Sequence, residues 1–310
     1  MDIGCNESRP ELTAVVVTYQ SEKSISATMK SLKLSHDKGI LNCIVIDNSS
    51  SDSTLKILED SKSWAQIVAN TENIGFGRGN NLGLKLVSTE YVIFINPDST
   101  IEPESIELLI RFMKDNSRAQ LISPAIVEPG GSVQGFGNLP TPWNIFLQQI
   151  PFLESPKRRL VYPGEAAFRT DWISGAFMMG RTSFLRDLGG FDPRYFLYFE
   201  ETDLCRRVLN ANGEIWCVGE AEGYHIGAVS SENLEIDRIG DCIAEFYYQS
   251  RYYYLWKHHG FLLATFVELF ELFLLMLRGI VVKCLKRNSI NVGLIRLRAP
   301  ILSLPKKVSD

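Results

Sequence analysis

The chain has 310 residues, of which 45% are apolar and 22% are charged, and its formal net charge at pH 7 is −4. This size and balance indicate a globular protein large enough for one α/β domain with an appendage, and they argue against a low-complexity or repetitive chain. The six cysteines are scattered and form no CxxC pair. That spacing argues against a zinc ribbon or a disulfide framework and suits a reducing cytosol.

The first hundred residues alternate short apolar runs with segments of helical character. We predict strands at 12–18, 41–46, 66–69 and 91–95, with helices at 24–34, from Asp52 and at 79–87. Such alternation is typical of a parallel sheet with right-handed crossovers. The strands end in polar residues that would share one rim of the sheet: Thr18-Tyr19, Asp47-Asn48, Asn96 and Asp98. Open α/β sheets bind ligands at that rim, so we predict a ligand crevice there.

The stretch YVIFINPDST at 91–100 places an acid at this rim. Its apolar run ends at Asn96, because Pro97 removes a backbone donor and stops regular strand pairing. Asp98 is then a carboxylate beside the expected ligand. The alternative is a turn residue that caps a helix beginning near Glu102.

The segment NIGFGRGNN at 73–81 favours an anion-binding loop. Its glycines let backbone amides approach a phosphate, a helix starting at Gly79 would add partial positive charge, and Arg78 would add a formal charge. A plain flexible turn explains the glycines about as well. A dinucleotide fingerprint is disfavoured, because the third glycine comes one residue early and the segment follows the third strand.

The middle of the chain has a looser pattern. We predict a helix from Glu102 to about Asn116, followed by a strand at 121–127, a long loop at 128–163 with a short helix near 143–150, a strand at 172–180 and a helix at 201–210. A loop of that length in a compact domain is usually functional or mobile.

Three carboxylates near the start of the last of these helices follow a run of aromatic residues: Glu200, Glu201 and Asp203. Apolar surroundings raise the pKa of a carboxylate, and a carboxylate with a raised pKa is a usable general base. The alternative is a solvated first helical turn, where acids favour the helix dipole. His225 is either structural or, together with Asp98, a ligand for a divalent cation on a diphosphate.

The C-terminal part has a different character. A helix at 241–259 is rich in tyrosine, and the run 261–277 is almost wholly apolar except for Glu268 and Glu271. Two carboxylates mid-run are costly at a bilayer centre, and their spacing puts them on one face, so an in-plane amphipathic helix fits better than a membrane span. A buried core helix is the alternative. From Arg278 onward the chain carries eight basic residues and a single acid, Asp310, which indicates an anionic surface as partner.

The segments VVVTYQ, IVIDNSSSD, ENIGFGRGNNLGL, FINPDS, WISGAFMMGR and GGFDPRYFLYFEETDLCRR, with a late histidine, keep a characteristic order over roughly residues 12–230. The set resembles the second family of inverting nucleotide-sugar glycosyltransferases, and most of all the bacterial rhamnosyltransferases of surface-polysaccharide assembly. The resemblance implies a single α/β domain of the glycosyltransferase A type, Rossmann-like with a mostly parallel sheet. Residues 1–100 would form its nucleotide-sugar-binding half, 101–235 its acceptor-binding and catalytic half, and 236–310 a helical, basic, membrane-associating region.

The resemblance also implies roles for individual residues. The metal-binding D-x-D of the family reads Asn96-Pro97-Asp98 here, which leaves Asp98 and His225 to hold Mg²⁺ or Mn²⁺. The Glu-Asp pair that carries the family's base reads Glu200-Glu201, so Glu201 is the expected base, with Glu200 and Asp203 as rivals. Trp172 is expected to contact the acceptor. Residues expected to bind the nucleotide sugar are Thr18, Tyr19, Asp47, Asn48, Asn73, Gly75, Arg78, Asn96, Gly175 and Ala176.

The expected function is an inverting, metal-dependent transfer of one sugar onto a glycan or lipid-linked acceptor, because the processive signature Q-x-x-R-W is absent. By resemblance the expected donor is dTDP-rhamnose, with a UDP-sugar as the alternative. The enzyme would be cytoplasmic and attached peripherally to the inner face of the cell membrane, with no nucleic-acid partner. Two other readings are a non-catalytic sugar-nucleotide binder and a structural partner in polysaccharide assembly.

Overall fold

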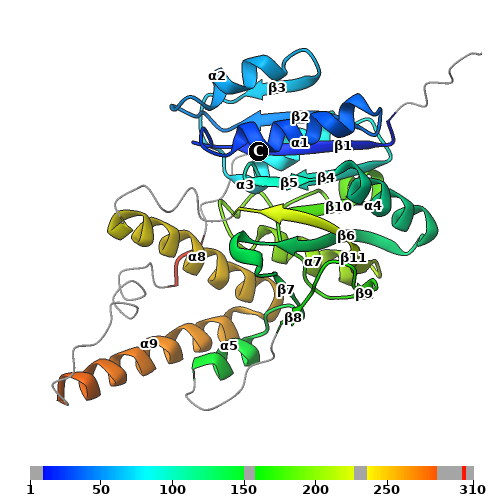
Figure 1. The fold of residues 1–310 in the computed structure, drawn as a ribbon. Helices are drawn as coiled ribbons and strands as arrows, with labels where there is room; N and C mark the ends of the chain where they lie inside the picture. The colour runs from blue at the N-terminus through cyan, green and yellow to red at the C-terminus, as the bar shows by residue number, and fades with distance from the viewer. Residues whose placement is uncertain (1–9, 150–157, 227–235, 285–301, 305–310) are drawn as a thin grey trace, which may run out of the picture.

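The computed structural model describes residues 10–149, 158–226, 236–284 and 302–304 (Figure 1). Its strands are β1 (Leu12–Thr18), β2 (Leu41–Asp47), β3 (Ala65–Ala69), β4 (Tyr91–Ile95), β5 (Ser99–Ile101), β6 (Ala119–Val127), β7 (Gly135–Phe136), β8 (Arg159–Leu160), β9 (Phe168–Arg169), β10 (Phe177–Arg181) and β11 (Glu214–His225). Its α-helices are α1 (Ile25–Asp37), α2 (Thr54–Leu58), α3 (Phe76–Leu86), α4 (Pro103–Asp115), α5 (Pro142–Gln149), α6 (Thr182–Asp187), α7 (Glu200–Asn210), α8 (Ile236–His259) and α9 (Phe261–Cys284).

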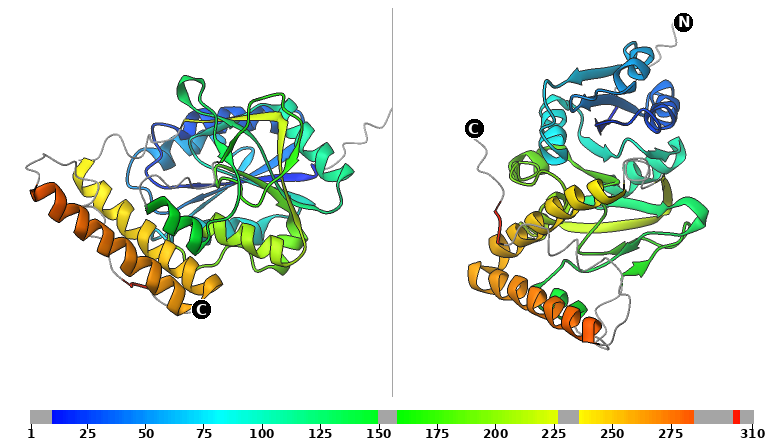
Figure 2. Two further views of the ribbon diagram at one scale, coloured as in Figure 1. Left: turned by 90° about the horizontal axis from the view of Figure 1, so that it is seen from below. Right: turned by 90° about the vertical axis from the view of Figure 1, so that its left-hand side faces the viewer.

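One mixed sheet forms the centre of the domain, in the order β3-β2-β1-β4-β10-β6-β11-β5, with β9 beside β11. The strands β1 to β4 are all parallel, as predicted, and their apolar side chains are almost continuously buried along β1, β2 and β4. Burial on both faces is what an apolar strand without alternation requires. Helices α1 and α4 pack on one face of the sheet, and α3, α6 and α7 pack on the other (Figures 1 and 2).

The strand order reverses between β1 and β4. The chain runs outward from β1 through β2 to β3, and then returns to the other side of β1 as β4. A reversal of this kind opens a crevice beyond the carboxyl ends of the two central strands. Thr18 and Asn96 stand at those ends, so the topology places the crevice where the polar strand ends predicted it.

The second half of the sheet is less regular than the sequence predicts. The strand expected at 172–180 begins only at Phe177, and it runs antiparallel to β4, with Phe177 opposite Ile95. The segment 172–176 therefore lies at the rim of the sheet instead of inside it. At the far edge β11 pairs antiparallel with β5, which sets His225 opposite Ser99.

The helices α8 and α9 form an antiparallel hairpin beside the sheet domain, with α5 packed along α9 (Figures 1 and 2). Gly260 joins them with a φ of +87°, a backbone conformation that glycine adopts without a Cβ clash. A second apolar core, separate from that of the sheet, holds the hairpin against the domain through Tyr195, Phe199 and buried tyrosines of α8.

The two acids of α9 point inward and pair with one arginine of α8. Arg251 bonds the carboxylate of Glu268 at 2.8 Å and also that of Glu271. The predicted shared face of the two acids is confirmed, and it is the face turned toward α8. No helix in the described ranges combines the length and the uniform apolarity needed to cross a bilayer. The basic residues counted from Arg278 onward lie outside the described side chains.

Candidate active site

A cavity of about 320 Å³ lies at the rim between β1 and β4. The predicted residues Thr18, Tyr19, Asn48, Asn73, Gly75, Asn96 and Asp98 line it. Asn48 is held in place by two hydrogen bonds: its amide Nδ2 donates to the carbonyl oxygen of Gly75 at 3.1 Å, and its Oδ1 accepts from Asn70 at 2.9 Å. The rim therefore gathers hydroxyl, amide and carboxylate groups around a space of the size that small ligands occupy.

The other predicted nucleotide-sugar residues lie outside this cavity. Asp47 is buried beneath it, where its carboxylate accepts from Thr18 Oγ1 at 2.8 Å and from Ser50 Oγ at 2.6 Å. Ala176 links its own segment to the end of β4, because its carbonyl oxygen accepts from the backbone N–H of Asn96 at 3.1 Å. Arg78 lines a different cavity, beside Arg186 and Pro193.

The glycines of the segment 73–81 serve packing more than anion binding. Helix α3 begins at Phe76 instead of Gly79, so Gly77, Gly79 and Gly83 all lie inside it. A Cβ added at Gly79 or Gly83 would come within 2.9 or 2.3 Å of a valine of β1. These glycines therefore let α3 approach the sheet closely, and Gly75, with a φ of +87°, makes the turn into the helix.

Asp98 and His225 meet at one end of the cavity. The backbone of the β5–β11 ladder brings them together, and His225 Nε2 lies 3.3 Å from Asp98 Oδ1. That carboxylate oxygen is buried without a hydrogen-bond partner. Gln134 contacts the other ring nitrogen of His225 at 3.2 Å and so fixes the ring. A buried oxygen without a partner facing an imidazole nitrogen fits a divalent cation bound together with diphosphate oxygens. The described residues hold no cluster of three or more acidic, histidine or cysteine side chains that would bind a metal by themselves.

The carboxylates Glu200 and Glu201 open helix α7 directly after a strained turn. Tyr198 and Phe199 both adopt left-handed backbone conformations, with φ of 67° and 66°. Two consecutive non-glycine residues in that region cost free energy that the surrounding structure must offset, and such strain clusters at functional sites. Phe199 is the residue that caps α7, so the strain fixes where the two carboxylates point.

Burial raises the pKa of Glu200 well above its usual range, and the charge of Glu201 raises it further. The pKa of Glu201 is also raised by burial, but its own hydrogen bonds, including one from Thr202, oppose the rise. Of the two, Glu201 is therefore the group that ionises more readily, and its raised pKa brings it toward the range of a useful general base.

A second cavity, of about 240 Å³, lies in front of Glu201. Trp172 lines it and joins a short hydrogen-bond chain: its indole N–H donates to Thr202 Oγ1 at 3.0 Å, and Thr202 donates to Glu201 Oε1 at 3.0 Å. Gly175 lies between Glu201 and Phe76, which lines the first cavity: a Cβ added at Gly175 would lie 3.7 Å from Glu201 and 3.8 Å from Phe76. Glu201 thus stands between the rim cavity and a second, smaller space.

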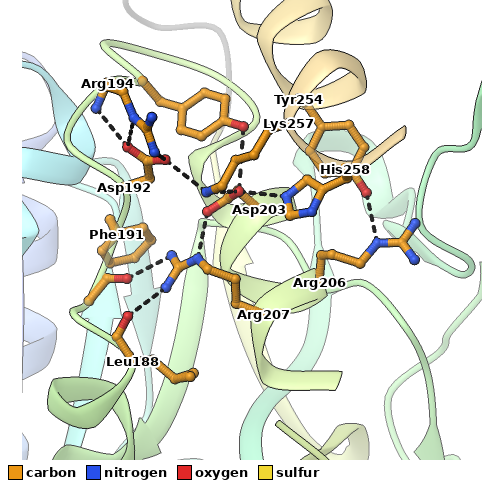
Figure 3. A network of polar contacts seen from close by, with 12 residues as sticks. Leu188, Phe191, Asp192, Arg194, Asp203, Arg206, Arg207, Tyr254, Lys257 and His258 are labelled. Atoms are coloured by element: carbon orange, nitrogen blue, oxygen red, sulfur yellow. Dashed lines mark hydrogen bonds and ion pairs between the residues drawn. The ribbon is translucent and has the colours of Figure 1, made fainter. Parts of the chain in front are cut away.

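Asp203 does not join this site. Its side chain is fully buried on the other side of α7, where Arg207, Lys257 and His258 contact its carboxylate at 2.5 to 2.7 Å (Figure 3). Burial alone would raise its pKa, but these three partners outweigh that effect and hold the pKa below its ordinary value. A carboxylate that is already bonded to an arginine and a lysine, and whose pKa is lowered, is a poor base, so these contacts argue against Asp203 as a rival to Glu201.

Several residues of both cavities went unpredicted. Helix α8 contributes Phe246 to the first cavity, where it stacks on Phe196, and Tyr247 and Arg251 to the second. Arg158 enters the second cavity from the long loop. The aromatic run before Glu200 was a signal for Phe196 and Tyr198, but no local pattern links α8 or the loop to the site.

Comparison with known proteins gives the family. Residues 13–177, more than half of the chain, match the description "Glycosyl transferase family 2". The chain belongs to glycosyltransferase family 2. It is therefore a glycosyltransferase, and the matched region contains most of the residues that line the rim cavity, together with Trp172 and Gly175.

Two similar proteins are named as rhamnosyltransferases. An N-acetylglucosaminyl-diphospho-decaprenol L-rhamnosyltransferase of Mycobacterium tuberculosis is 26% identical over 240 residues, which cover 71% of this chain and 77% of the relative. The rhamnosyltransferase WbbL of Escherichia coli K12 is 24% identical over 161 residues, 49% of this chain and 60% of WbbL. The resemblance to rhamnosyltransferases is thus confirmed at the level of sequence.

Solved structures confirm the fold. The crystal structure of Staphylococcus aureus TarS has a TM-score of 0.53 and 20% identity, and the match covers 76% of this chain. This chain spans 42% of TarS, and the likeness concerns the fold alone.

Proposed function

We propose that this glycosyltransferase moves a single sugar from a nucleoside diphosphate to an acceptor hydroxyl, with inversion at the anomeric carbon and with Glu201 as the general base. The observation that carries the proposal is the position of Glu201, which lines the second cavity and lies close to Gly175, a glycine that also approaches Phe76 of the rim cavity. A donor in the rim cavity and an acceptor in the second cavity would then meet beside one carboxylate with a raised pKa.

The proposed reaction uses the two cavities in turn. The acceptor hydroxyl lies against Glu201, which accepts its proton as the oxygen attacks the anomeric carbon. The bond from that carbon to the diphosphate breaks on the opposite side, which inverts the configuration. Thr202 and Trp172 hold the carboxylate of Glu201 in place through their hydrogen bonds. Mg²⁺ or Mn²⁺, held by Asp98 and His225, would offset the charge that builds up on the departing diphosphate.

Rhamnose from dTDP-rhamnose is the proposed donor sugar. The support is sequence similarity to two rhamnosyltransferases, one from M. tuberculosis and one from E. coli. The hydroxyl and amide groups of Thr18, Tyr19 and Asn48 in the rim cavity do not by themselves favour a thymidine over a uridine diphosphate.

The proposed acceptor is carried on a lipid at the inner face of the cytoplasmic membrane. A face of α9 is exposed and apolar, with Leu262 82% and Phe266 54% exposed, while its acids are turned inward to Arg251. Trp143 of α5, 64% exposed, extends this face. An outward apolar face followed by a basic segment in the sequence suits attachment to an anionic bilayer. The M. tuberculosis relative, by its name, acts on a diphospho-decaprenol.

Release of nucleoside diphosphate from a panel of donors tests the proposal. Purified protein would be incubated with dTDP-rhamnose, UDP-glucose or UDP-N-acetylglucosamine, with Mn²⁺ or with a chelator. We expect turnover to be fastest with dTDP-rhamnose and to require the metal. Turnover of a UDP-sugar without dTDP-rhamnose turnover overturns the donor assignment, and binding without any turnover favours the non-catalytic reading.

A further inference from the structure

Two arginines line the cavity in front of Glu201, and they differ in whether a carboxylate pairs with them. Arg251 is buried, and the carboxylates of Glu268 and Glu271 both contact its guanidinium. Arg158 lines the same cavity, but among the described residues no carboxylate lies within ion-pair distance of it. The cavity therefore holds one cation, Arg158, that no carboxylate of the described residues neutralises.

Arg158 is held in place by packing instead of by a counter-charge. Arg158 directly precedes β8, which pairs with β7. Two glycines at β7 leave room for Arg158: a Cβ added at Gly135 would lie 2.6 Å from the Cβ of Arg158, and a Cβ added at Gly137 would lie 3.5 Å from its Cα. Its guanidinium stacks over the ring of Trp172, with 4.0 Å between the guanidinium carbon and the ring centroid. Stacking on an indole positions a guanidinium and leaves its N–H donors free at the edges.

The stack is connected to the proposed base. Trp172 lies beneath Arg158 and donates to Thr202, which donates to Glu201. A ligand group bound by Arg158 would thus be fixed relative to the carboxylate that takes the acceptor proton. Carboxylates and phosphates are the groups whose geometry matches the planar fork of an arginine.

We propose that Arg158 binds a phosphate group carried by the acceptor, so that the acceptor is a sugar esterified to a phosphate or diphosphate. The inference rests on the proposed function, because it places the acceptor in the cavity of Glu201. A cation here also offsets the repulsion between the ionised base and an anionic acceptor. The cavity is smaller than the ~300–1,000 Å³ of drug-sized ligand pockets, which suits one sugar unit with its phosphate.

The surroundings favour a lipid as the carrier of that phosphate. Helix α5 supplies Ile145 to the cavity wall, and its next residue, Phe146, stacks on Phe266 of α9 and packs in a tilted arrangement against Phe270. The cavity therefore adjoins the exposed apolar face of α5 and α9. A hydrocarbon chain attached to the phosphate has an apolar path away from the cavity.

The test compares binding of farnesyl diphosphate, farnesol and inorganic pyrophosphate by calorimetry, with thymidine diphosphate and Mg²⁺ at saturation to keep the rim cavity occupied. The variant is Arg158→Gln. The matched control is Arg159→Gln, since Arg159 is the next residue but pairs with Glu165 and stacks on Phe168 outside the cavity. Arg158→Lys keeps the charge without the fork, and thermal unfolding of each variant checks the fold.

We expect wild type and Arg159→Gln to bind farnesyl diphosphate at least about tenfold more tightly than farnesol. Arg158→Gln should bind farnesyl diphosphate about 10- to 100-fold more weakly than wild type, because it loses a charge-assisted hydrogen bond. Arg158→Lys should fall between them. Pyrophosphate binding as tightly as farnesyl diphosphate, with the same dependence on Arg158, supports a soluble phosphate ester; tighter binding of farnesyl diphosphate supports the lipid.

Equal affinities for farnesyl diphosphate in folded Arg158→Gln and Arg159→Gln overturn the inference. That failure is distinct from failure of the proposed function, which would show as absence of thymidine diphosphate and donor binding in the wild type.

Discussion

Glu200 and Glu201 are neighbours in the chain, yet the fold gives them different surroundings. Glu201 reaches a cavity and accepts a hydrogen bond from Thr202, whereas Glu200 is buried with its Oε2 lacking a partner. The sequence placed both at the start of a helix behind aromatic residues. It left the choice between them open, because neighbouring residues on a helix face different ways and only the packing decides which one reaches the cavity.

Glu201→Gln should keep donor binding and lose sugar transfer, because an amide cannot accept the acceptor proton. We expect a fall of roughly 10²–10⁴-fold in kcat, and substantial activity in Glu201→Asp, which keeps the carboxylate. Steady-state kinetics with calorimetry of donor binding measures both. Glu200→Gln is the matched control: if it is the inactive variant and Glu201→Gln is active, the assignment is wrong.

The rate of transfer should also fall as the pH drops through the pKa of Glu201. A base works in its deprotonated form, and burial raises this pKa above the ordinary value of 4.5. A pH profile of kcat/KM should therefore show an acid limb whose midpoint lies above 4.5. The same limb in an otherwise active Glu201→Gln variant would contradict the assignment.

Asp98 was predicted from one proline-terminated strand, and His225 from its place in the family. Their meeting at 3.3 Å depends on a β5–β11 pairing that joins residues more than a hundred positions apart, which no local pattern could predict.

We expect Asp98→Ala and His225→Ala to weaken Mn²⁺-dependent donor binding at least tenfold, as loss of charge-assisted contacts implies. Asp115→Ala, an exposed acid at the end of α4, is the control. Unchanged donor affinity in both site variants, measured by calorimetry, would refute the metal site.

At the scale of elements, α7 and α8 are joined by a cluster of ion pairs that the sequence did not reveal. Lys257 bridges Asp203 of α7 and Asp192, and His258 contacts Asp203 as well (Figure 3). These partners lie more than fifty residues apart, so local periodicity predicted each helix but not their contact.

The first four strands were predictable because each is a buried apolar run with a polar end. The start of α3 was misplaced because its glycines were interpreted as a loop.

Asp203→Asn should destabilise the protein by roughly 3–5 kcal/mol, the range for removing one partner of a buried ion pair, because Arg207 loses its carboxylate partner and Lys257 keeps only Asp192. Chemical denaturation monitored by circular dichroism measures the loss. Asp171→Asn, on the exposed loop, is the control. A change within about 0.5 kcal/mol of the control would show that the cluster contributes little to stability.

The same cluster should make stability depend on pH. Asp203 and Asp192 have folded-state pKa values below the ordinary 3.8, because their cationic partners outweigh the effect of burial. Their contribution is present above the unfolded pKa and is lost as the pH falls through the folded values. Wild type should therefore lose stability below about pH 4 more steeply than Asp203→Asn. Parallel curves of unfolding free energy against pH would contradict this.

At the scale of the molecule, the α8–α9 hairpin adds side chains to both cavities and carries an outward apolar face. The sequence predicted the apolar run and the shared face of its two acids, but it did not show that Arg251 takes both acids. That pairing spans 17 and 20 residues across a hairpin, and it turns the two acids of the segment 261–277 away from the exposed side of α9.

This face should bind anionic membranes. We expect wild type to sediment with phosphatidylglycerol vesicles at low salt and less so at high salt, since screening weakens attraction to basic residues. Leu262→Ser with Phe266→Ser should reduce binding at both salt concentrations, because it removes exposed apolar area. Lys33→Ser with Lys56→Ser, on α1 and α2, serves as the control. Wild type that stays in the supernatant at low salt contradicts the proposed attachment.

The central claim is transfer with inversion, promoted by Glu201. It is tested most directly by proton NMR of the sugar first released when purified protein hydrolyses dTDP-rhamnose with Mn²⁺, recorded before mutarotation. We predict that the first anomer has the configuration opposite to that of the donor, and that Glu201→Gln forms it at least about a hundredfold more slowly. A first product of retained configuration, or one formed as fast without the carboxylate of Glu201, would contradict the claim.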